Sequence, residues 1–165
     1  MKLLSRELLT DEQWAVLRDA PQLVIRAISA SGGSPLDSLF ERKAGTRAIE
    51  DGRNNDHPLI RALALPGEID AAVSNVAARV RTGDTAVDGP EALVQRATAA
   101  VAQAAEVLRS VGGELDRYAY REFILGAARE VAEAAREGDF IGLGGHRVSD
   151  AERAVIASLS QALSS

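Results

Sequence analysis

The sequence predicts an all-α protein in which residues 1–165 form a single-domain bundle of seven or eight helices. Alanine is abundant and favours helices, because its side chain loses no conformational entropy there. Apolar residues recur at spacings of three and four, which places them on one face of a helix. Six short motifs also have the form of helix starts, with an oxygen-bearing side chain near a first-turn proline, carboxylate or amide. These motifs are Thr10-x-x-Gln13, Asp19-x-Pro21, Ser34-Pro35-x-Asp37, Asp56-x-Pro58, Asp88-x-Pro90-Glu91 and Ser149-x-x-Glu152.

The first half of the chain predicts five helices separated by turn residues. A helix at 10–18 ends before Pro21, where a second helix with a wide apolar stripe begins, and Gly32-Gly33 ends that second helix. The polar segment 50–58 is predicted to be a loop, and Pro66-Gly67 stops the short helix that follows it. The predicted ranges are 10–18, 21–30, 35–51, 59–65 and 68–81.

Two long helices at 90–111 and 114–136 are predicted to form an antiparallel hairpin at the centre of the bundle. Apolar seams run along both, and in the first of them alanines alternate with larger residues, so a neighbouring helix can pack closely. Gly126 lies inside the second helix and predicts a close helix crossing. A last helix is expected at 149–163. The seam residues are Val94, Ala97, Val101, Ala104, Leu108 and Val111, then Tyr120, Ile124, Ala127, Val131 and Ala134.

Composition and charge exclude several classes of protein. The net charge of −5 and the isoelectric point near 5.1 argue against nucleic acid as the main partner. The absence of cysteine excludes disulfides and thiolate metal sites. No stretch approaches 18 uncharged apolar residues, so we expect no membrane span, and charges interrupt the apolar start of the chain before a secretory core could form. We therefore expect a cytoplasmic protein.

The polar segment 50–58 holds the most concentrated set of potential metal ligands, Glu50, Asp51, Asp56 and His57. Its spacing does not fit a calcium loop, because the glycine comes too early. We favour an exposed loop in which Asp56 caps the next helix.

Other candidate chemistry lacks the context it requires. Neither His57 nor His146 lies in a Glu-x-x-His or His-x-x-x-His pattern. The run Gly142-x-Gly144-Gly145 precedes a helix, but no predicted strand leads into it, so a phosphate-binding loop is not indicated. Tyr118 and Tyr120 lie on different helix faces and are expected at the rim and in the core. We predict no catalytic, cofactor-binding or metal-binding residue.

Two stretches resemble the TerB-like family of small all-helical bacterial proteins, which is named for tellurite resistance. They are residues 20–30, with the sequence APQLVIRAISA, and the apolar pattern from Phe123 to Glu152. The resemblance implies a helical bundle. In that family an acidic Asp-Gly turn followed by a glutamate is proposed to hold a metal. Here the corresponding turn, 31–37, has no acid beside its glycines, although Glu41 remains downstream.

These observations favour a non-enzymatic cytoplasmic bundle that acts through protein contacts, either with a protein partner or by self-association. The resemblance implies a role in a stress response. The alternative is an acidic metal-responsive protein that uses the ligands of segment 50–58, or Glu41 with Glu152. A carboxylate di-metal enzyme is a third alternative.

Overall fold

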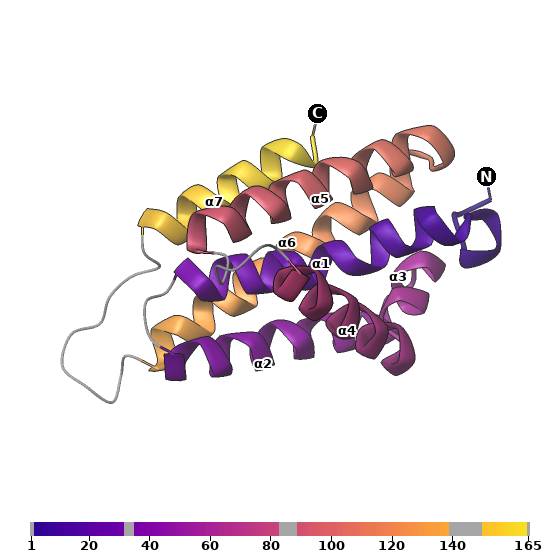
Figure 1. Cartoon of the computed structure of the whole chain (residues 1–165). Coiled ribbons are helices and arrows are strands. Elements are labelled where there is room, and N and C mark those ends of the chain that lie inside the picture. The colour runs from indigo at the N-terminus through magenta and orange to yellow at the C-terminus, as the bar shows by residue number, and fades with distance from the viewer. Residues whose placement is uncertain (1, 32–34, 83–88, 139–149, 165) are drawn as a thin grey trace.

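The computed structural model describes residues 2–31, 35–82, 89–138 and 150–164, and within these ranges it contains helices and no strand (Figure 1). The predicted fold class, a single-domain all-α protein, is confirmed. The α-helices are α1 (Asp11–Ser31), α2 (Pro35–Asp51), α3 (Pro58–Leu63), α4 (Pro66–Thr82), α5 (Pro90–Val111), α6 (Glu114–Gly138) and α7 (Asp150–Ala162), and two 3-10 turns are η1 (Arg6–Leu8) and η2 (Gly52–Asn54).

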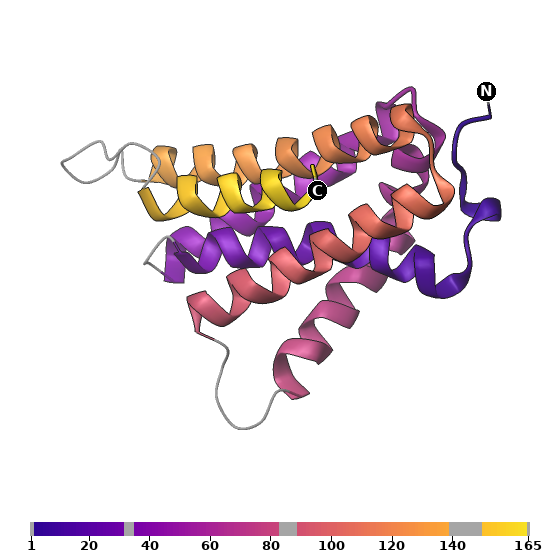
Figure 2. The ribbon, with the colours of Figure 1, turned by 90° about the horizontal axis from the view of Figure 1, so that it is seen from above.

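Helix α1 is the centre of the bundle. It packs against α5, α2, α4 and α6, and between Asp19 and Ser29 every residue except Arg26 is buried. The wide apolar stripe that the sequence indicates in this segment is therefore buried. Helix α7 packs on both α5 and α6, and Figure 2 shows it running beside α6.

The predicted hairpin differs from the observed packing. Helices α5 and α6 do follow one another through a short turn, but α5 packs chiefly along α1, and α6 packs chiefly along α2. The alanine seam of α5 is buried as predicted, since Ala97, Val101 and Ala104 are fully inaccessible to solvent. The seam's partner was predicted wrongly, because a heptad pattern shows that a helix packs there and not which one.

A single helix replaces the two that were predicted on either side of Pro21. Proline removes the N–H that would bond the carbonyl of Leu17, four residues earlier. The hydroxyl of Tyr120 in α6 donates to this carbonyl at 2.8 Å and restores the missing bond. The helix therefore continues through the proline, and Asp19 is a buried interior residue rather than a helix cap.

The other helix-start motifs have different outcomes. The Thr10 motif is confirmed as a capping box, since the Gln13 N–H donates to Oγ1 of Thr10 at 3.2 Å and the Thr10 N–H donates to Oε1 of Gln13 at 3.0 Å. Asp56 is not a cap, because His57 occupies that position. Pro66 begins α4 rather than only ending α3. Ser34, Asp88 and Ser149 lie outside the described residues, as do Gly32-Gly33, His146 and the 142–145 glycines.

Two glycines, Gly45 in α2 and Gly52 in η2 directly after it, permit a close approach to neighbouring helices. A Cβ atom on Gly45 would lie 2.6 Å from Cγ2 of Val131 and 2.7 Å from Cγ1 of Ile25. A Cβ atom on Gly52 would lie 2.8 Å from a ring carbon of Phe123. A larger residue at position 45 would push α2 away from α1 and α6, and one at position 52 would push η2 away from α6.

Gly126 does not have the role that was predicted for it. A Cβ atom there would meet nothing within 4 Å, so no close helix crossing explains this glycine. Within the described part of the chain, no helix is long and apolar enough to cross a membrane.

Candidate functional site

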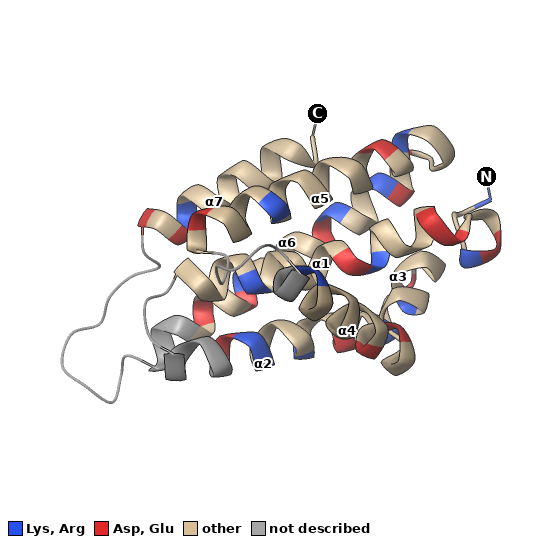
Figure 3. Cartoon of the chain, in the orientation of Figure 1, with Lys and Arg blue, Asp and Glu red and all other residues tan. Residues whose placement is uncertain are grey.

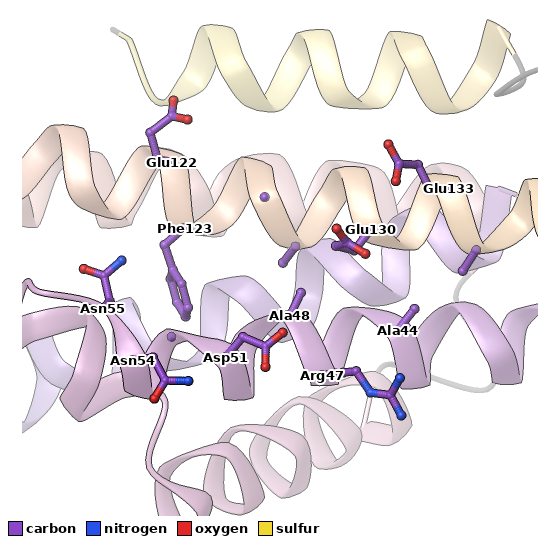
Figure 4. A pocket seen from close by; sticks show the side chains of 14 residues that line it. Ala44, Arg47, Ala48, Asp51, Asn54, Asn55, Glu122, Phe123, Glu130 and Glu133 are labelled. Carbon is purple, nitrogen blue, oxygen red and sulfur yellow. The ribbon is translucent and has the colours of Figure 1, made fainter.

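A cleft of about 620 Å³ lies between α2 and α6 and extends to η2 (Figure 4). Its volume falls within the range of small-ligand sites. The residues that line it are Ala44, Arg47, Ala48, Asp51, Gly52, Asn54, Asn55, Glu122, Phe123, Gly126, Ala127, Glu130, Glu133 and Ala134.

Small side chains keep this α2–α6 cleft open. Ala44 and Ala48 line it from α2, and Gly126, Ala127 and Ala134 line it from α6. A glycine inside a helix destabilises it by about 0.5–1 kcal/mol relative to alanine. A methyl group would fit at Gly126, so close packing does not explain why a destabilising glycine is present there. The structural consequence of the glycine is a wider cleft.

The charge of the α2–α6 cleft is mainly negative, because four carboxylates and one guanidinium line it. Figure 4 shows the carboxylate of Asp51 beside α2 and that of Glu130 beside α6, whereas Glu122 and Glu133 rise from α6 on the side away from α2. Glu122 lies 3.9 Å from Arg129, and both side chains are exposed. Asp51 and Glu130 form no ion pair with any described side chain.

A second cleft, of about 510 Å³, lies where α5 ends, α6 begins and α7 ends. Three arginines and one glutamate contribute to it, which makes its charge opposite to that of the α2–α6 cleft. The lining residues are Ala105, Leu108, Arg109, Glu114, Arg117, Tyr118, Arg121, Leu163 and Ser164. Figure 3 shows charged residues of both signs at this end of α5 and α6, while α7 beyond its first turns carries none.

The spacing of residues along α6 explains why the second cleft has this lining. Positions 114, 117, 118 and 121 are separated by three and four, so they share one face of the helix. Glu114, Arg117 and Tyr118 are exposed and Arg121 is half-buried, whereas Tyr120 and Ile124 of the same helix lie in the core. Arg121 donates to the hydroxyl of Ser160 in α7 at 3.3 Å, and Arg109 lies 2.5 Å from Glu106. Arg117 forms no ion pair with any described side chain.

Three large apolar side chains are exposed next to the second cleft. Val111 is 41% exposed, Leu115 is 53% exposed and Tyr118 is 65% exposed. Val111 was predicted to continue the α5 seam, but the seam ends at Leu108, because α5 extends beyond the residues that cover it. The predicted rim position of Tyr118 and core position of Tyr120 are both confirmed.

His57 is buried rather than exposed in a loop, and it contacts a carboxylate from another part of the chain. Its Nε2 lies 2.9 Å from Oδ1 of Asp116, at the start of α6. The same carboxylate accepts the N–H of Leu4 at 2.8 Å and the N–H of Gly113 at 2.6 Å. Asp116 therefore joins three segments of the chain, and its role is structural.

The candidate ligands of segment 50–58 do not gather at one point. Asp51 lines the α2–α6 cleft, Asp56 is exposed, and His57 contacts Asp116 instead. Glu41 and Glu152 are both buried, in α2 and α7. Among the described residues, no group of three or more histidines and carboxylates has the arrangement of a metal site.

A buried polar network between α1 and α4 was not predicted. Asp19 lies 2.9 Å from Nε of Arg18 and 3.5 Å from Arg79, and Asn75 donates to it at 3.5 Å. The indole of Trp14 donates to Glu68 at 2.9 Å.

Burial raises the pKa of Tyr120, and the charge of Asp19 adds to this effect. The Tyr120 hydroxyl therefore stays protonated and can donate to the carbonyl of Leu17.

Comparison with known proteins adds no relative, since the chain matches no family model, no curated protein and no solved structure. The resemblance to TerB-like proteins therefore stays a prediction.

The two clefts were not predicted from the sequence, although each left a signal in it. Gly126 is an interior helix glycine without a packing reason, and Leu115 and Tyr118 are large apolar residues on a charged helix face.

Proposed function

We propose that this chain is a non-enzymatic cytoplasmic protein that acts by binding a protein partner at the α5–α6 end of the bundle. The observation that carries the proposal is the exposure of Val111, Leu115 and Tyr118 beside the arginine-lined second cleft. Exposed aromatic side chains and arginines are the residue types most enriched in protein interfaces. We call these three apolar residues, together with Arg109, Arg117 and Arg121, the α5–α6 contact surface.

The charge of this surface indicates the chemistry of the partner. Three guanidiniums and the single carboxylate of Glu114 give the second cleft a positive charge, although the whole chain has a net charge of −5. An acidic segment that carries an apolar side chain would match both the arginines and the exposed apolar residues.

Pairing between two copies of this chain is less favourable at the same place. In a two-fold dimer the surface would meet itself and bring arginines of like charge together. A heterologous partner avoids this repulsion. Sedimentation of the purified chain is therefore expected to show no association that depends on Arg117.

Site-specific photocrosslinking in cells tests the proposal. A photoreactive benzoylphenylalanine replaces Tyr118 in one variant and Val73, an exposed residue of α4, in a matched control. We expect a crosslink at position 118 whose mapped partner segment is acidic, and we expect Arg117→Glu to remove it. The same products at both positions, a basic partner segment, or a crosslink that survives Arg117→Glu would contradict the proposal.

A further inference from the structure

We propose that the second cleft, which lies between the ends of α5 and α7 and the start of α6, binds a small organic monocarboxylate with a branched aliphatic body. The inference goes beyond the protein contact proposed above, because it concerns a small ligand that binds without a partner. Both would use Arg117 and Arg121, so we expect the organic acid to displace the partner.

Arg121 lies in this cleft with hydrogen-bonding capacity that the protein does not use. Its Nε–H is buried and no described group accepts it, and its Nη2 donates to Ser160 of α7 only over 3.3 Å, which is long for a hydrogen bond. The side chain is half-buried, so its guanidinium is partly removed from water. An anion is attracted more strongly to such a charge than to an arginine surrounded by water. A carboxylate is the matching group, because its two oxygens can accept two hydrogen bonds from one guanidinium.

The charges that line the second cleft favour a ligand with a single negative charge. Arg109 lies 2.5 Å from Glu106, so this guanidinium is already paired. Arg117 and Arg121 remain, with Glu114 as the carboxylate of the lining, which leaves one positive charge in excess. The two arginines are four residues apart on one helix face, so both can reach the same carboxylate. The whole chain has a net charge of −5, and a general attraction for anions therefore does not account for binding at this place.

The walls of the second cleft can accept an aliphatic group. Ala105 and Leu108 of α5 are buried, and Leu163 at the end of α7 is half-buried. None of these side chains offers a hydrogen bond, so a hydrocarbon can lie against them without leaving a polar group unpaired. The volume of about 510 Å³ falls within the range of small-ligand sites. An acid with a carboxylate at one end and a branched hydrocarbon at the other therefore matches both the arginines and the apolar walls.

Amide NMR spectra of the isotopically labelled full-length chain, recorded while isocaproate is added, test the inference. We expect saturable shifts at the amides around Arg121 and Leu163, with a dissociation constant on the order of 1 mM. Two related compounds serve as ligand controls. Acetate keeps the carboxylate and lacks the branched body, whereas isocaproamide keeps the body and lacks the charge. Each should bind more weakly by about tenfold or more, because each loses one of the two kinds of contact.

Variants of the arginines test the same site from the protein side. Arg117→Gln and Arg121→Gln each remove one guanidinium, and each should weaken isocaproate binding by about tenfold. Arg153→Gln is the matched control, since Arg153 is an exposed arginine of α7 outside the cleft, and it should stay within about twofold. If Arg121→Gln does not fold, the exposed Arg117 decides alone.

Four results would overturn the inference: shifts that do not saturate, equal binding of acetate or isocaproamide, an equal loss in Arg153→Gln, or unchanged affinity in Arg117→Gln. The crosslink at position 118 separates this inference from the proposed protein contact. A crosslink that persists in a chain that does not bind isocaproate would refute the small-ligand site and leave the protein contact intact.

Discussion

The hydroxyl of Tyr120 donates a 2.8 Å hydrogen bond to the main-chain carbonyl of Leu17, more than a hundred residues earlier in the chain. This carbonyl lost its helical partner to Pro21, which has no N–H. The bond joins α6 to the central helix α1 at the position where Pro21 interrupts the helical hydrogen bonding. The buried tyrosine and the interior proline therefore form one structural unit.

Tyr120→Phe is expected to destabilise the fold by about 1–3 kcal/mol, because it leaves a buried carbonyl without a donor. Chemical denaturation measures the change, and Tyr118→Phe, at an exposed position, is the control that should stay within about 0.5 kcal/mol. Adding Pro21→Ala restores an N–H near Leu17, so the double variant should lose less than the sum of the two single changes. Strict additivity would mean that the two residues are not coupled.

Asp116→Ala is expected to destabilise the fold by about 3–5 kcal/mol, because it removes the buried carboxylate that two main-chain N–H groups and His57 contact. Hydrogen exchange should show a local loss of protection at the amides of Leu4 and Gly113. Glu114→Ala, at a neighbouring exposed carboxylate, is the control. Unchanged exchange at Leu4 would show that Asp116 does not hold the N-terminal segment.

Gly126→Ala is expected to stabilise the fold by about 0.4–1 kcal/mol, because alanine favours the helix and its methyl group meets no neighbour. Gly45→Ala should have the opposite effect and destabilise the fold by about 1–3 kcal/mol, because its Cβ would overlap the side chains of Val131 and Ile25. Thermal or urea denaturation compares the two variants. Changes of the same sign would contradict the packing described around these glycines.

Ala104→Leu is expected to destabilise the fold by about 1–3 kcal/mol through overpacking, since Ala104 is fully buried where α5 packs along α1. Ala102→Leu makes the same change at an exposed position of the same helix and should have little effect. A denaturation midpoint for Ala104→Leu at or above that of the unchanged chain would place this face of α5 outside the core.

Local signals in the sequence predicted most of the helices but not how they pack. The capping box of Thr10 and the apolar period of α5 depend only on residues close in the chain, and both are present. The continuation of α1 through Pro21 could not be predicted in the same way, because it depends on Tyr120 from a distant helix. The choice of α1 rather than α6 as the partner of α5 has the same origin.

The candidate sites illustrate the same limit. His57 was identified as a possible ligand, but its neighbour Asp116 is far away in the sequence and no spacing rule joins them. The α2–α6 cleft combines residues of α2, η2 and α6, of which only Asp51 had been named as a candidate ligand. Gly126 was noticed, but an interior helix glycine is expected both where two helices cross closely and where a cleft is open. The sequence alone does not distinguish these two causes.

The central claim is that the α5–α6 contact surface binds an acidic segment of a partner, and fluorescence anisotropy tests it most directly. The segment crosslinked at position 118 is synthesised with a fluorophore and titrated with the unchanged chain, with Arg117→Glu and with Arg153→Glu. Arg153 is an exposed arginine of α7, so its reversal makes the same charge change outside the surface. We predict that Arg117→Glu weakens binding by about tenfold or more, while Arg153→Glu stays within about twofold. Equal weakening by both reversals, or none by Arg117→Glu, would contradict the claim.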